Sequence, residues 1–197
     1  MKRTGIPFLW RNYVKEKAQE RVIVTGFEPP NIFYKGVNGE FKGLDITGGV
    51  KYVKGNSKGV DITGGVKYVD YGNSKGFDIT GLVKIVYDKN SEGVDITGGI
   101  KAVGGDSKGF DVTGVAKLVD GNSKGVNLTG GINYSKNVKD WLIEYGTLVN
   151  IVEKAPDEAF VLQVGLWNSI GNQHCPIINI KGMKNLSRIL GLKKEKK

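Results

Sequence analysis

Six consecutive copies of one short unit occupy the middle of this chain. Each copy opens on a glycine, continues with Asp or Asn and then Thr, and all differences in length fall in the closing segment of the Gly-Asn-Ser-Lys type. Six copies exceed the three or so that a repeat array needs to bury a shared face. The chain is therefore restricted to folds made by repetition. The units begin 16 or 17 residues apart, at Gly43, Gly59, Gly76, Gly93, Gly109 and Gly125.

Within a unit, apolar and polar residues alternate with the period of a β-strand. Many of the apolar residues are β-branched, which suits a pleated and half-buried surface, and the glycines exclude a continuous helix. The closing segment has the composition of a turn. We expect the apolar residues to face the core and the polar residues to face solvent. In the second unit the expected core residues are Val60, Ile62, Val66 and Tyr68, and the expected solvent-facing residues are Asp61, Thr63 and Lys67.

The sequence predicts an all-β fold, and two arrangements of the repeats fit it. In a β-solenoid with capping ends, each 16–17-residue unit is one coil, and a glycine pair such as Gly64–Gly65 forms a corner. In an antiparallel up-and-down meander or barrel, each unit is a single strand. The antiparallel pairing sets each Asp opposite a neighbouring Lys, whereas a parallel stack places like charges about 4.8 Å apart. The near identity of all the loops favours the solenoid.

Two columns of charge recur through the units, one acidic and one basic. We predict that they form a surface ladder, because isolated charges are rarely buried. A calcium-binding β-roll would need its Asp and Gly columns twice per coil, and here each Asp occurs once and is balanced by a Lys, so no metal site is expected. The acidic column is Asp45, Asp61, Asp78, Asp95 and Asp111, and the basic column is Lys51, Lys67, Lys84, Lys101 and Lys117.

The chain divides into four predicted segments. The N-terminal cap combines good helix formers over residues 8–21 with a strand in RVIVTGF. The degenerate repeats after the sixth unit keep the strand pattern but lose the Asp and Thr columns. In order, the segments are an N-terminal cap with a short helix and a strand (1–42), six tandem β repeats (43–137), degenerate repeats with a C-terminal cap (138–182) and a basic tail (183–197).

The net charge of +9 belongs to the two ends of the chain. Residues 31–180 hold sixteen basic and sixteen acidic side chains, whereas residues 181–197 hold seven basic and one acidic. Specific nucleic-acid recognition would need basic and aromatic residues interleaved on a folded face, which the repeats lack. The predicted anionic contact in the tail is at Lys193, Lys194, Lys196 and Lys197.

The C-terminal segment resembles a known family. Gln163-Val-Gly-Leu-Trp-Asn168, followed by Pro176-Ile-Ile-Asn179, is similar to the closing signature of bacterial surface repeat-containing proteins with G-[VL]-Q-[IL]-G-L-x-N units. The match is detailed only at residues 161–180; in the central units Asp or Asn replaces Gln, and Lys usually replaces Asn. The resemblance implies an all-β repeat protein, often displayed on a cell surface, without an established activity.

No enzyme chemistry is expected from this chain. Its single His and single Cys are adjacent, at His174 and Cys175, so neither a nucleophile–base pair nor a His/Cys metal site can form. No cofactor is expected either. The leading hypothesis is a non-enzymatic structural or interaction scaffold built from β repeats, and the candidate partners are a second copy of the protein or a polyanion. The alternatives are a module that binds nucleic acid or another polyanion through the Lys column and the tail, and a glycan-binding protein that uses Trp141 and Trp167.

The sequence carries no recognisable targeting signal. The apolar stretch near the N-terminus is too short for a signal-peptide core, and no window approaches the 18 or more apolar residues of a membrane helix. The default expectation is a cytoplasmic protein, and the family resemblance adds the cell surface as the alternative location.

Overall fold

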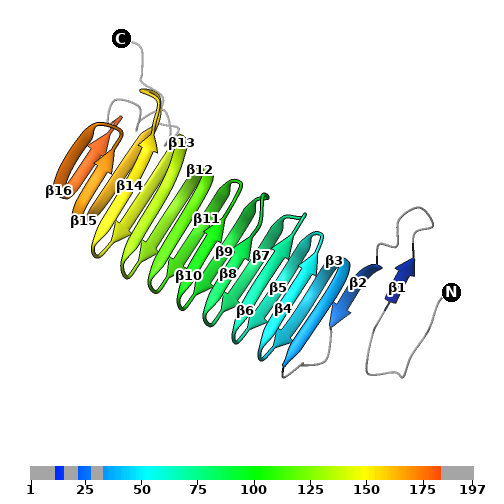
Figure 1. Ribbon diagram of the computed structural model, residues 1–197. Helices are drawn as coiled ribbons and strands as arrows, with labels where there is room; N and C mark the ends of the chain where they lie inside the picture. Colours follow the sequence, from blue (N-terminus) through cyan, green and yellow to red (C-terminus); the bar gives the residue numbers. More distant parts are fainter. Residues whose placement is uncertain (1–11, 16–21, 28–32, 183–197) are drawn as a thin grey trace, which may run out of the picture.

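The computed structural model describes residues 12–15, 22–27 and 33–182, with side chains from residue 33 onward. Within these ranges the chain consists of β-strands and short turns. The strands wind into coils that stack along one axis as a straight, elongated body (Figure 1). Strands of successive repeats pair in parallel. The predicted β-solenoid is therefore confirmed, and the antiparallel meander or barrel is wrong.

Each repeat forms one coil of two strands joined at two corners. Equivalent residues of successive coils pair directly, so that Asp61 lies beside Asp78 and Lys67 beside Lys84. The first sheet contains β5 (Ser57–Thr63), β7 (Ser74–Thr80), β9 (Ser91–Thr97) and β11 (Ser107–Thr113). The second sheet contains β4 (Val50–Lys54), β6 (Val66–Asp70), β8 (Val83–Val86) and β10 (Ile100–Val103).

Longer strands bend around a corner and belong to both sheets. The first part of β3 (Tyr34–Thr47) pairs with β4 and its second part pairs with β5. The regular stack therefore begins at Tyr34, before the first repeat glycine. At the other end, the stack continues through β12 (Ala116–Thr129), β13 (Ile132–Gly146), β14 (Val149–Lys154) and β15 (Phe160–Ile170). The parallel stack thus continues past the sixth unit.

The ends of the stack differ from its middle. β16 (Gln173–Lys181) turns back and pairs antiparallel with β15, which closes the C-terminal end. At the N-terminal end, β2 (Val22–Phe27) adds in parallel to β3 as the sequence predicted, and β1 (Asn12–Lys15) pairs antiparallel with β2. The predicted helix over 8–21 is wrong for its described part, because β1 lies inside that range and gains backbone hydrogen bonds from β2. The basic tail lies outside the described residues.

Glycines allow the coils to approach one another at the corner and along the first sheet. The amide of Gly64, in the predicted corner, donates to the carbonyl of Thr47 in the preceding coil at 2.8 Å. Gly59 has a φ of +122°, and a Cβ atom there would lie 2.1 Å from the carbonyl oxygen of Gly43. The same approach recurs from coil to coil, which explains why the first residue of each unit is always glycine. At the opposite corner, Ser57 and Ser74 already belong to strands, so the turn is shorter than the predicted Gly-Asn-Ser-Lys segment.

The two faces of each strand are reversed relative to the sequence prediction. Asp61, Thr63 and Lys67 are buried between the sheets, whereas Ile62 is 36% exposed and points outward. In the central repeats, the apolar part of the core is instead a single row from the second sheet, packed beside Phe41, and a second apolar cluster that includes Leu142 and Val161 fills the C-terminal end. The row comprises Val37, Val53, Val69, Val86, Val103 and Val119.

Candidate functional site: an internal ion-pair ladder and apolar outer faces

The predicted surface ladder is an internal one. Its ten Asp and Lys residues are all 3% exposed or less. Each Lys projects from the second sheet, and the first four lie between the Asp of their own coil and the Asp of the next, whereas Lys117 lies between Asp111 and Asn127. Lys67 Nζ is 2.5 Å from Asp61 and 2.8 Å from Asp78, and Lys84 Nζ is 2.5 Å from both Asp78 and Asp95. The charges therefore alternate along the axis of the solenoid.

This alternation removes the objection that a parallel stack places like charges together. The Asp residues do form a column, but a Lys ammonium group lies between successive carboxylates. Asp61 and the later Asp residues of the column also accept a hydrogen bond from the Ser four residues earlier, as in Ser74 Oγ to Asp78 Oδ2 at 2.6 Å. A buried charge is tolerated when it is paired and hydrogen-bonded, and here both conditions are met at each inner rung.

The electrostatic environment keeps the acidic column ionised. Burial opposes the charge of Asp61, but Lys67 and Lys51 outweigh it and hold the pKa of Asp61 below its usual range. Lys101 and Lys84 do the same for Asp95, so its pKa is also well below the usual range. Burial disfavours the ammonium form of Lys84, but its two Asp neighbours raise its pKa.

The ladder is balanced over its full length. Among the described residues the interior contains six Lys and six acidic side chains. The additional members are Lys35, which pairs with Asp45 at the N-terminal end, and Glu144 at the C-terminal end. A neutral interior avoids the cost of uncompensated buried charge. The formal charge of the protein is therefore carried by other residues.

After the last Lys the ladder changes from ions to amides. Asn127 occupies the next position in the Asp column, followed by Glu144 and then Gln163. In the Lys column, Asn133 donates to Asn150 at 2.8 Å, and Asn150 donates to Asn168 at 2.7 Å. The Gln and Asn of the family-like segment thus lie in the same two interior columns as Asp and Lys of the central repeats.

The Thr column does not form an outward hydroxyl array. Thr63, Thr80, Thr97 and Thr113 are buried, and their hydroxyl oxygens have no hydrogen-bond partner. Each of them directly precedes the glycine corner of its coil, and the row lies in the interior.

The outer faces of both sheets are apolar. On the first sheet, two uninterrupted columns cover the coils from β3 to β12. We call this surface the apolar face; its members are Leu44, Val60, Phe77, Val94, Phe110 and Val126 in one column and Ile46, Ile62, Ile79, Ile96, Val112 and Leu128 in the other. Contiguous apolar surface of this extent marks an interaction site on a soluble protein.

A row of lysines borders the apolar face along one side. We call Lys42, Lys58, Lys75, Lys108 and Lys124 the lysine row, which Glu92 interrupts between the third and fourth member. Lys75 pairs with Glu92 at 2.7 Å, and Lys124 pairs with Asp140 at 2.6 Å. Between the row and the face, the repeat glycines form the floor of a groove of about 710 Å³ that includes Phe110 and Trp141.

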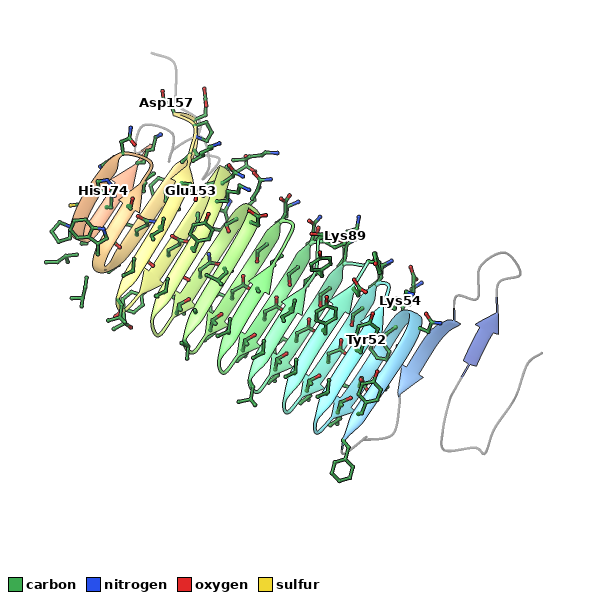
Figure 2. The ribbon with its side chains drawn as sticks, viewed as in Figure 1. Tyr52, Lys54, Lys89, Glu153, Asp157 and His174 are labelled. Carbon is green, nitrogen blue, oxygen red and sulfur yellow. The ribbon has the colours of Figure 1, made fainter. Side chains whose placement is uncertain are left out.

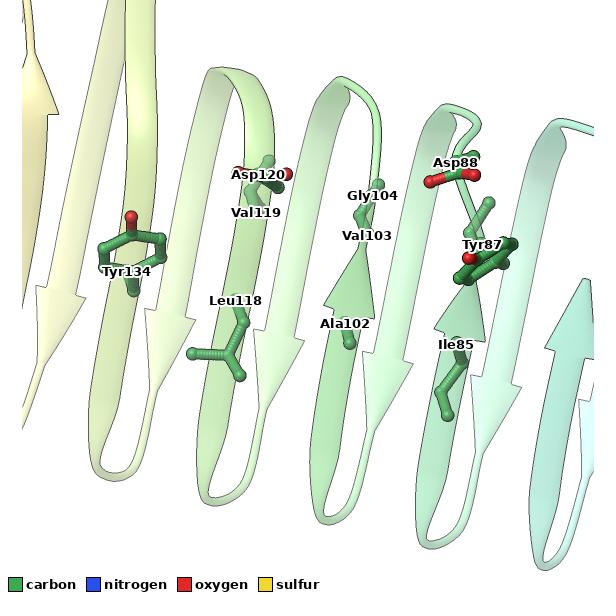
Figure 3. Close-up of a pocket in the computed structure, with 11 residues that line it drawn as sticks. Ile85, Tyr87, Asp88, Ala102, Val103, Gly104, Leu118, Val119, Asp120 and Tyr134 are labelled. Atoms are coloured by element: carbon green, nitrogen blue, oxygen red, sulfur yellow. The ribbon is translucent and has the colours of Figure 1, made fainter.

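The outer face of the second sheet is less regular. Its column includes Tyr52 and Tyr68, which stack with ring centroids 5.5 Å apart, and Tyr52 projects from the N-terminal half of the stack (Figure 2). Ala102 lies between the larger Ile85 and Leu118 and leaves a pocket of about 540 Å³, rimmed by Tyr87 and Tyr134 (Figure 3). The Tyr134 hydroxyl already donates to Glu153 at 2.5 Å, so it is not free to orient a ligand.

The remaining predicted site residues are dispersed. His174 stacks on Trp167 at 6.0 Å between ring centroids, at the C-terminal end of the stack (Figure 2). Cys175 is a free, half-buried thiol. Residues 33–182 contain no cluster of three His, Cys, Asp or Glu side chains suited to a metal ion. The predicted contacts Lys193, Lys194, Lys196 and Lys197 lie outside the described residues.

The described residues also contain no helix long and apolar enough to span a membrane. Comparison of the chain with protein-family models, with curated proteins and with solved structures gave no match.

Proposed function

We propose that the protein is a non-enzymatic structural scaffold that assembles face to face with a second copy of itself. The observation that carries this proposal is the inversion of the coil: charged side chains stabilise the interior, and apolar side chains cover the outside. The Lys column is buried, which argues against contact with a polyanion through this column and favours the scaffold.

The apolar face is large enough for a specific dimer. Six strands of the first sheet, from β3 to β12, carry its two columns. At about 4.8 Å per step between strands and about 3.3 Å per residue along the strands, this part of the sheet measures roughly 24 by 23 Å. Two copies packed face to face bury roughly 1,100 Å² in total, above the roughly 1,000 Å² that a specific interface needs. A second copy has the same spacing of side chains, so the ridges of one face fit the grooves of the other.

The apolar face is a better candidate than the outer face of the second sheet. The second sheet carries the tyrosine hydroxyls and the gap at Ala102, whereas the apolar face has no polar side chain in either column from Leu44 to Leu128. The family resemblance implies display on a cell surface. We include the cell surface in this proposal as the location of the assembled scaffold.

Sedimentation velocity tests this proposal on the full chain. We expect the wild type to dimerise, and we expect the double variant Phe77→Lys and Phe110→Lys to sediment as a monomer because it places charges at the centre of the interface. Both positions are about 37–39% exposed, so the variant should retain the fold, which circular dichroism would verify.

The matched control is the double variant Ile85→Lys and Leu118→Lys on the second sheet, which should remain dimeric. A wild type that stays monomeric at all concentrations contradicts the proposal. A monomer that binds lipid vesicles through Phe77 and Phe110 would also contradict it, since the occupant of the face would then be a membrane.

A further inference from the structure

The interior ladder contains one position where its chemistry changes, at the junction between ions and amides. Lys51, Lys67, Lys84 and Lys101 each lie between two Asp carboxylates. Lys117 instead lies between Asp111 and the side-chain amide of Asn127. Among the five Lys residues of the ladder, Lys117 is the one that contacts an uncharged carboxamide.

The carboxamide is also in contact with a buried acid. Asn127 Nδ2 donates to Glu144 Oε1 at 3.4 Å, while its Oδ1 accepts from Lys117 Nζ. Glu144 is held in place by Ser135 Oγ at 2.9 Å and by Gln163 Nε2 at 3.0 Å. An amine, an amide carbon and a carboxyl group are therefore fixed in sequence, shielded from water, with all three residues about 1% exposed or less.

We propose that Lys117 and Asn127 form an intramolecular amide bond, with Glu144 as the proton-transfer group. The site meets the requirements of such a reaction, because it holds a nucleophile, an electrophile and an acid in fixed contact. An Asp carboxylate would be a poor electrophile, since the attacking amine would meet a negative charge. The other buried Lys residues therefore remain in ion pairs.

The electrostatics of the site favour the protonation states that the reaction needs. Burial lowers the pKa of Lys117, although Asp111 opposes this, and a lower pKa favours the neutral amine. Burial raises the pKa of Glu144, which favours the protonated carboxyl group. The pKa of Asp95 in the acidic column shifts in the opposite direction, to below its usual range.

The reaction balances without an oxidant or a co-reactant. Asp111 accepts one proton from the Lys117 ammonium group, and the neutral Nζ attacks Cγ of Asn127. The Cγ–Nδ2 bond breaks as Glu144 protonates Nδ2, which leaves as ammonia, and Glu144 then accepts the second proton from Nζ. The proton on Asp111 leaves with ammonia as ammonium. The product is a covalent link between the second sheet of one coil and the first sheet of the next coil.

Intact mass spectrometry of the purified full chain tests the proposal. We expect a mass lower than that of the sequence by one ammonia molecule in most of the protein. Because cyclisation at an Asn-Gly pair such as Asn38–Gly39 also releases ammonia, tryptic mapping must locate the loss. The expected product is one branched peptide in which residues 109–124, uncleaved at Lys117, are joined to residues 125–136. A folded wild type with the full sequence mass overturns the proposal.

Two variants test the role of Glu144. Glu144→Gln keeps the size of the side chain but removes its proton-transfer capacity. We expect the intact mass of this variant to equal the mass of its full sequence, without loss of ammonia. Circular dichroism checks that the variant is folded. Asp78→Asn is the matched control, because it places a carboxamide between Lys67 and Lys84 with no protonated acid next to it. We expect this variant to form the link at Lys117 and no second one. A second link in Asp78→Asn, or an undiminished link in Glu144→Gln, would overturn the role of Glu144.

Discussion

Replacing Lys84 by Met should lower the free energy of unfolding by about 3–5 kcal/mol, the cost of breaking a buried ion pair by removing one partner. Lys84 is fully buried and lies 2.5 Å from both Asp78 and Asp95. Without its ammonium group, two carboxylates in adjacent coils face each other across an apolar side chain. Urea denaturation followed by circular dichroism measures the loss.

Lys75→Met is the matched control for this substitution. Lys75 also pairs with a carboxylate of the next coil, Glu92 at 2.7 Å, but its side chain is 42% exposed. An exposed pair contributes about 0–1 kcal/mol, so the control should unfold almost like the wild type. Equal and small losses for the two variants would contradict a buried ladder.

The second large effect concerns acid. Asp61, Asp95 and Asp111 have pKa values below their usual range, because the neighbouring Lys charges outweigh the effect of burial. A group whose pKa is lower in the folded state contributes stability that is present above its unfolded pKa of about 3.9, and this stability is lost as the pH falls through the folded pKa. The pKa of Glu144 is raised instead, but this single group opposes the combined effect of three Asp residues.

We therefore expect the melting temperature to stay nearly constant from pH 7 to about pH 4.5 and to fall steeply below about pH 4. Added salt should change this profile little, because buried pairs are poorly screened. Melts followed by circular dichroism over this pH range provide the measurement. A melting temperature that is independent of pH below 4 would show that the acidic column does not stabilise the fold.

The repeat spacing predicts a fold built from stacked units, and the near identity of the loops favours the solenoid that the structure shows. Gly59 and its equivalents mark the coil length, and the glycine pair at Gly64–Gly65 correctly predicts a corner. The two strands per coil follow from that corner. Their parallel direction was predicted from the identity of the loops, against the argument from charge, which favoured antiparallel pairing.

The orientation of the strands could not be predicted from hydrophobicity. Strict alternation places one set of residues inside and the other outside, but it does not say which set is inside. The rule that charged residues face solvent predicts that the apolar set is inside. This rule fails when opposite charges are matched one to one in a stack. The sequence of a single unit does not reveal ion pairs between coils, because Lys67 pairs with Asp78 of the next coil.

The sequence nevertheless contains a signal of the true orientation. The column of Val60 alternates between Val and Phe, and the column of Tyr68 continues with Ile85, Ala102 and Leu118. The columns of Ser, Asp, Thr and Lys change little from the second to the fifth unit, as does the Val column that includes Val69. Variation from copy to copy is tolerated on the outside, whereas a closely packed interior requires the same residue in each coil.

Selective acetylation of lysines under native conditions, mapped by mass spectrometry, tests the central claim most directly. The protein offers two sets of Lys residues on the same coils, one inside and one outside. We predict that Lys42, Lys75, Lys108 and Lys124 of the lysine row react, since their side chains are 42–47% exposed. Lys51, Lys67, Lys84 and Lys101 should stay unmodified until urea unfolds the chain. Reaction of these ladder lysines at the same rate as the lysine row would contradict the internal ladder.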